Sequence, residues 1–343
     1  MSRADVKGTA GNLAGPAVSG TAPGTAAPGT AAPGTAAPET AAARAATLFA
    51  GARSAPGGGR RGGAGVGGTA VWPWWRLLKS ELYLVFRKWR HLALLAVLGA
   101  LPVLLGIALR VSEPHGGGGP NSFFFGQVAG NGVFLAFIAL TLMLVLALPL
   151  AVAVVSGDSV AGEAGAGTLR YLLAVPAGRT RLLSVKYVAV LVYGLTACVV
   201  AAGMSLAVGV ALFPVGPVTL LSGTTVPLTD GLLRLLFVTL YVAAGLAALG
   251  AIGLAISTFT EHPIGAIAAT MIITVASEVT DQVPQFAAVQ PYLPTHWWLS
   301  FDALLRSPIA TGDLLHGLLS FGMYIVIFCS IAWARFTTTD VTS

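Results

Sequence analysis

The stretch DSVAGEAGAGTLRYLLAVPAGRTRLLSVK, residues 158–186, separates two strongly apolar runs and decides how the chain is arranged. One run ends at Val155 and the next begins at Tyr187. Because hydrocarbon cannot solvate charged side chains, we expect residues 156–186, called the hinge below, to lie in water at one face of a membrane. Its bases outnumber its acids, which favours the cytoplasmic face. The charged residues are Asp158, Glu163, Arg170, Arg179, Arg181 and Lys186.

A short helix is expected within the hinge. Leu169, Leu172 and Leu173 follow one another at the spacing of one helical face. Pro176 ends this helix because it has no N–H to donate and restricts the residue before it. The apolar face of such a helix needs a cover, which is either the membrane surface, the rest of the bundle or a cytoplasmic partner.

The order of residues in the hinge resembles the signature of type-2 ABC transporter permeases. In that family an acid is followed by Gly-Thr-Leu, a Leu pair, Pro-x-x-Arg and a Lys that opens the next span. This chain departs from the pattern at Ala164–Ala166, where charged residues are usual, and at Gly178, where Ser or Thr is usual. The matching positions are Asp158, Glu163, Gly167, Thr168, Leu169, Leu172, Leu173, Pro176, Arg179 and Lys186.

The resemblance implies a role for each part of the hinge. It implies an all-α membrane protein with six transmembrane helices, in which a cytoplasmic coupling helix between spans two and three contacts a separate ATPase subunit. Glu163 and the Leu169 face would make that contact, and Arg179 and Lys186 would anchor the hinge to headgroups or to the partner. The resemblance further implies an exporter that pairs with a second permease copy or homologue, with ATP bound by the ATPase subunit.

Composition supports a protein with several membrane spans. Only 19 lysines and arginines and 13 acidic residues occur among 343, whereas 55% of the residues are hydrophobic. In a soluble domain about a quarter of the residues are charged. The net charge of +6 does not indicate nucleic-acid binding, because most bases lie before residue 91 or in the hinge, as expected of cytoplasmic segments.

The chain divides into three parts. Residues 1–70 repeat Gly-Thr-Ala-Ala-Pro and are rich in glycine, so we expect a disordered tail. Residues 71–90 have one apolar face and several tryptophans, which predicts a cytoplasmic interfacial helix. Residues 91–343 form the six-span domain. The predicted spans are about 92–109, 133–155, 187–213, 235–259, 264–279 and 318–334.

Small residues indicate where the spans approach one another. Gly203 with Ala207, and Gly245 with Gly250 and Gly253, would allow close helix contacts. Gly203 or Gly209 could also break the third span.

The loops place both termini on the cytoplasmic side of a cell membrane. The segment 277–317 carries four acids and one base, so we expect it outside. In it, Trp297 and Trp298 are predicted interface anchors, and Phe301, Leu304 and Leu305 have helical spacing. The segment is either a cap lying on the membrane or a gate through which substrate leaves.

No enzyme chemistry is evident in the sequence. It contains no HExxH, CxxC, GxSxG or GxxxxGK[ST] motif, and its five histidines are scattered. We therefore expect no catalytic residue, metal or cofactor in this chain, and Cys198 and Cys329 are expected to be packing residues. The alternative to a permease is an ATPase-independent carrier or a membrane scaffold, although no acid is predicted near the middle of a span, where a carrier usually needs one.

The predicted topology can be tested by labelling. In a cysteine-free variant, single cysteines at Gly118, Gly223 and Ala310 should react with an impermeant thiol reagent on intact cells, because these positions are predicted to lie outside. Cysteines at Ala164 and Ala177 should react only after the cells are opened. The reverse pattern would contradict the orientation.

Overall fold

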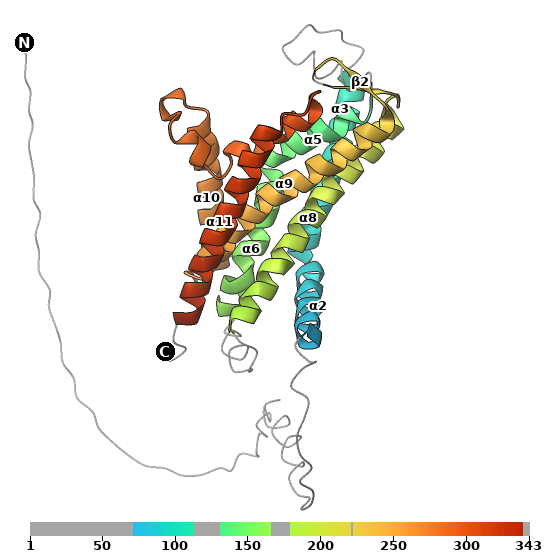
Figure 1. Cartoon of the computed structure of the whole chain (residues 1–343). Helices are drawn as coiled ribbons and strands as arrows, with labels where there is room; N and C mark the ends of the chain where they lie inside the picture. Colours follow the sequence, from blue (N-terminus) through green and yellow to red (C-terminus); the bar gives the residue numbers. More distant parts are fainter. Residues whose placement is uncertain (1–70, 113–130, 166–178, 221, 339–343) are drawn as a thin grey trace, which may run out of the picture. The chain divides into compact units, whose positions relative to one another are not determined.

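The computed structural model describes residues 71–112, 131–165, 179–220 and 222–338 (Figure 1). The described part is almost entirely helical. A two-stranded antiparallel hairpin, with Val218 opposite Val226, is its described sheet. The elements are α2 Val71–Arg87, α3 Trp89–Ser112, α5 Phe134–Val145, α6 Ala147–Gly165, α8 Arg179–Leu212, β1 Val218–Thr219, β2 Thr225–Val226, α9 Leu228–Ser257, α10 Pro263–Asp281, η2 Pro284–Phe286, η3 Gln290–Tyr292, η4 His296–Leu305 and α11 Thr311–Thr338.

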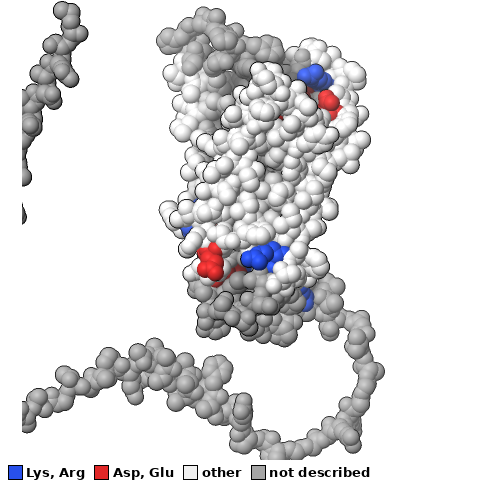
Figure 2. Space-filling model, turned by 90° about the vertical axis from the view of Figure 1, so that its left-hand side faces the viewer, with Lys and Arg blue, Asp and Glu red and all other residues white. Residues whose placement is uncertain are grey.

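Six described helices are long and apolar enough to cross a bilayer, which confirms the predicted all-α, six-span fold. They are α3, α6, α8, α9, α10 and α11. On the face shown in Figure 2, charged side chains gather near the two ends of the helices and leave a broad band without charge between them. Such a band is what a hydrocarbon layer requires of the surface that faces it.

The second predicted span, 133–155, is not one helix. It is divided at Leu146, whose φ of −145° lies outside the helical region, into α5 and α6. Pro149 explains the break, because it cannot donate to the carbonyl of Val145 and its ring would collide with that carbonyl. After the break α6 continues to Gly165, ten residues into the segment predicted as hinge.

The third span is one unbroken helix. α8 has 34 residues, so it is roughly 50 Å long and extends beyond a hydrocarbon layer of about 30 Å. α8 continues through Gly203 and Gly209 without interruption, so the break considered at either glycine is absent. We use "hinge end" for the end of the bundle where α6 stops at Gly165 and α8 starts at Arg179.

Helices α6 and α9 form the centre of the bundle, and glycines on α9 bring the neighbours close. A Cβ added to Gly253 would lie 2.1 Å from the Ser156 hydroxyl oxygen, and one added to Gly250 would lie 2.8 Å from Val190. The predicted close contacts at Gly245, Gly250 and Gly253 are thus confirmed. The one predicted at Gly203 is wrong, because a Cβ there would meet nothing within 4 Å.

The segment between α10 and α11, called the cap below, consists of η2, η3 and η4. Trp298 is 2% exposed and packs against Gly245 of α9 and Phe321 of α11, so the prediction of an interface anchor is wrong for this residue. The cap is also bonded to α9. The Tyr241 hydroxyl donates to the Trp297 carbonyl at 2.8 Å, and Arg234 donates to the carbonyls of Leu304 and Arg306.

Two glycines where backbones touch offer a test of this packing. A Cβ on Gly209 of α8 would lie 2.0 Å from the carbonyl oxygen of Gly132, which is backbone and cannot yield easily. We expect Gly209→Ala to destabilise the protein by about 1–3 kcal/mol, seen as a lower Tm in detergent. Gly203→Ala, on the same helix, should leave Tm unchanged or raise it, because alanine favours a helix. Equal effects of the two changes would contradict the packing.

Candidate functional site

The structure describes four of the ten residues predicted to couple the chain to an ATPase. Asp158 and Glu163 lie on α6, Arg179 is the first residue of α8, and Lys186 lies two turns further along α8. The predicted coupling helix lies outside the described residues, since it falls within 166–178. Gly167, Thr168, Leu169, Leu172, Leu173 and Pro176 belong to that segment.

The sequence had led us to expect Asp158 in water, but the residue is buried among helices. It is 4% exposed, and its carboxylate accepts a hydrogen bond of 2.6 Å from the Lys88 ammonium, which lies between α2 and α3. The Arg90 guanidinium is 3.8 Å from the same oxygen. A buried carboxylate without a partner would cost several kcal/mol, so these bases allow α6 to continue through Asp158 inside the protein.

Lys186 is the second buried charge at the hinge end. It is 2% exposed, and its ammonium lies 2.5 Å from Glu163, 3.6 Å from Glu81 and 2.9 Å from the Ser159 carbonyl oxygen. Lys186 therefore points into the protein and joins α8 to α6 and α2. It does not point toward lipid headgroups.

Glu163 occupies a position where its charge needs this support. It lies in the last turn of α6, where the backbone dipole disfavours a negative charge. The Lys186 ammonium, at 2.5 Å, offsets that effect.

A cavity of about 370 Å³ is lined by residues of both ion pairs and by parts of α2, α3, α6 and α8. His91 faces it and is 2% exposed. Its Nδ1 lies 2.9 Å from the Val85 carbonyl oxygen, while its Nε2 lies 3.8 Å from Asp158 and has no hydrogen-bond partner among the described residues. The hinge end thus gathers charges of both signs from four helices. We call Glu81, Lys88, Asp158, Glu163 and Lys186 the hinge-end charge cluster.

The sequence analysis did not identify Glu81, Lys88 and His91 as site residues. A signal for two of them exists, because Glu81 and Lys88 are seven residues apart and share a helical face with Leu78 and Val85. Charges on an apolar face need partners from another element. The apolar face of α2 in fact packs against α8 and α3, so these charges meet α6 and α8 within the protein.

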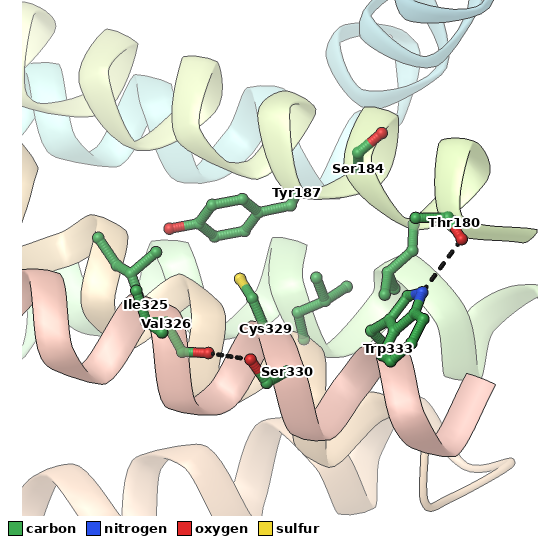
Figure 3. Close-up of a pocket in the computed structure, with 10 residues that line it drawn as sticks. Thr180, Ser184, Tyr187, Ile325, Val326, Cys329, Ser330 and Trp333 are labelled. Atoms are coloured by element: carbon green, nitrogen blue, oxygen red, sulfur yellow. Dashed lines mark hydrogen bonds between the residues drawn. The ribbon is translucent and has the colours of Figure 1, made fainter. Parts of the chain in front are cut away.

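A groove of about 460 Å³ lies between α8 and α11, with Leu254 of α9 beside it (Figure 3). Tyr187 and Cys329 project into it from opposite helices, and the Trp333 indole donates to the Thr180 hydroxyl at 3.1 Å across it. The Tyr187 and Ser330 hydroxyls donate to backbone carbonyls at 3.1 and 2.6 Å. Because these polar groups are bonded within the protein, the groove presents a mainly apolar surface.

Within the described residues, no group of three or more His, Cys, Asp or Glu side chains is placed to hold a metal ion. The arrangement at the hinge end provides electrostatic attachment between helices.

The buried pair on α8 can be tested by removing one partner. Lys186→Met leaves Glu163 and Glu81 near each other without a base, so we expect a loss of about 3 kcal/mol of stability, measured as Tm in detergent. The double variant Lys186→Met/Glu163→Gln should recover part of that loss. Asp302→Asn, which removes the exposed pair with Arg306, should change stability by no more than about 0.5 kcal/mol. A stable Lys186→Met variant would show that the cluster is not needed for folding.

Comparison with known protein families shows which family the chain belongs to. The family model described as ABC-2 family transporter protein matches residues 79–277. No match to a curated protein was found. The matched range begins on α2, ends on α10 and includes the whole hinge-end charge cluster, and it covers more than half of the chain. The chain belongs to the ABC-2 transporter family and is a multi-pass permease component of an ABC transporter.

Proposed function

We propose that this permease subunit works as one half of an ATP-driven exporter.

 The permease would couple ATP hydrolysis by a separate ATPase subunit to the movement of substrate across the cell membrane. One observation carries the proposal: the hinge-end charge cluster joins α2, α6 and α8 where α6 and α8 lead into the segment 166–178.

The cluster makes these three helices suited to move together. Separating Lys186 from Glu163, or Lys88 from Asp158, would leave a buried charge without its partner, which costs about 3–5 kcal/mol for a buried pair. The half-exposed Lys88 lowers that figure for its own pair. A force applied to the segment 166–178 would therefore displace α6, α8 and α2 as one unit.

This unit supports a mechanism of alternating access. Two permease copies, or one copy and a homologue, would stand on two ATPase subunits. ATP binding would draw the ATPases together and move the coupling helix, and the attached helices would rock between two states. The hinge end and both termini would be cytoplasmic, in keeping with the bases of the hinge. Export is the direction that the likeness to type-2 permeases implies.

ATP is assigned to the partner in this proposal. The sequence contains no GxxxxGK[ST] motif, so the phosphates would be held by the ATPase subunit. The residues of this chain would receive the movement and not the nucleotide.

The groove between α8 and α11 favours an apolar cargo. Its volume of about 460 Å³ lies within the range of about 300–1,000 Å³ found for ligand pockets. Its hydroxyl groups are already bonded to the protein, so a hydrophilic cargo would find few partners there. The groove opens on the side of the bundle, where a molecule dissolved in the membrane could enter it.

The alternative, an ATPase-independent carrier or a scaffold, makes a different prediction about association. We expect the permease purified in mild detergent to retain an ATPase with a Walker motif. The activity of that ATPase should depend on the permease. Purification without any ATPase, together with transport that survives ATP depletion, would favour the alternative.

Glu163 offers a sharper test of coupling. Glu163→Gln keeps the shape of the side chain and leaves Lys186 with Glu81 and the Ser159 carbonyl, so we expect normal membrane levels and normal pairing. Transport and stimulation of the ATPase should fall several-fold. Glu163→Lys should be worse, since it places two ammonium groups together.

The control is Glu261→Gln, which changes an exposed acid beside the end of α6. It should leave transport unchanged. Wild-type transport in both Glu163 variants, at equal expression, would move the coupling role to other residues of the hinge.

A further inference from the structure

Ser257, the last residue of α9, inserts its hydroxyl into the backbone of α6. The side chain is fully buried. Its Oγ donates to the Gly157 carbonyl at 2.8 Å and accepts from the Ala161 N–H at 2.8 Å and the Val160 N–H at 3.2 Å. In a regular α-helix the Ala161 N–H and the Gly157 carbonyl bond to each other. Ser257 thus bonds to both groups of one rung of the α6 hydrogen-bond ladder.

Three other buried hydroxyls on the helices behave differently. Ser205 of α8 and Thr239 of α9 are also buried, and each donates to the carbonyl four residues earlier on its own helix. Thr270 of α10 does the same. That arrangement satisfies a buried hydroxyl without help from a second helix. The contact of Ser257 with α6 is therefore not needed to satisfy its own hydroxyl.

Two arrangements of this junction satisfy the same groups. In the one observed, Ser257 bridges Gly157 and Ala161. In the other, the Ser257 hydroxyl leaves α6 and donates to the Gly253 carbonyl on its own helix, while the α6 groups keep the bonds of a regular helix. Neither leaves a buried polar group without a partner, so exchange between them avoids the large cost of an unmade hydrogen bond.

The bridged turn of α6 lies within the hinge-end charge cluster. Asp158 follows Gly157 and pairs with Lys88, and the Ser159 carbonyl accepts from Lys186. A displacement of the charge cluster would therefore act directly on the turn that Ser257 holds.

Helix α9 carries contacts at its other end as well. Arg234, in its second turn, donates to the carbonyls of Leu304 and Arg306 in the cap, and Tyr241 donates to the Trp297 carbonyl. α9 thus runs from α6 at the hinge end to the cap (Figure 1). A shift at Ser257 can reach the cap through one continuous helix.

We propose that Ser257 is a positioning residue that links movement of the hinge end of α6 to α9 and, through α9, to the cap. The link rests on the proposed function for its role in transport. When α6 is displaced, Ser257 is released from its backbone, and α9 no longer holds the cap in the observed position. The cap then serves as the gate at the far end of the bundle.

The link itself is tested without an ATPase, by hydrogen exchange of the full-length protein in lipid nanodiscs. Ser257→Ala should speed exchange several-fold in peptides covering 158–165 and also in peptides covering 296–306. The matched control, Ser205→Ala, removes a buried hydroxyl that bonds only its own helix and should change neither region. A change confined to 158–165, or equal changes in the two variants, would overturn the link.

The role in transport is tested in the complex with the ATPase. Ser257→Ala should retain ATPase stimulation while transport per ATP hydrolysed falls several-fold, and Ser257→Cys, which keeps a weak donor, should fall between Ala and the wild type. Unchanged transport per ATP in Ser257→Ala would overturn this role. If the wild-type protein shows no ATP-driven transport, the proposed function fails, whereas the exchange experiment still decides whether Ser257 links α6 to the cap.

Discussion

Burial of charge inside an apolar helical bundle is the constraint on which the hinge end depends. Asp158 and Lys186 are each less than 5% exposed, and neither could remain charged there without a partner. The partners come from other elements: Lys88 follows α2, Glu81 lies on α2 and Glu163 lies on α6. Helix α2 must therefore pack against the bundle. Its apolar face contacts α8 and α3.

Small residues supply a second constraint, which acts between backbones. Gly253 allows α9 to approach Ser156 of α6, and a Cβ on Gly157 would come within 2.8 Å of Ile267 on α10. With the three helices this close, a side chain as short as Ser257 reaches the backbone of α6. Apolar packing without these glycines would hold the helices further apart, and the bridge could not form.

The two constraints join different sets of helices. The charge cluster joins α2, α6 and α8 near the segment that resembles a coupling helix, while the backbone contacts join α6 to α9 and α10. The cap depends on α9 through Arg234 and Tyr241. The permease therefore has a continuous set of contacts from the hinge end to the cap, and the groove between α8 and α11 lies beside it. A transporter of the proposed kind would need such a connection, because energy would enter at one end and substrate would leave at the other.

The sequence alone determined the number of spans and the fold class, because the length and hydropathy of an apolar run are local properties. It also revealed the family through the order of residues in the hinge. Only the tertiary structure decided which residues meet. The extension of α6 to Gly165, the burial of Trp298 and the partners of Asp158 and Lys186 all depend on which helices are neighbours. Spacing along one helix cannot reveal that, because a partner such as Ser257 lies about a hundred residues away and is recognised only when the two backbones touch.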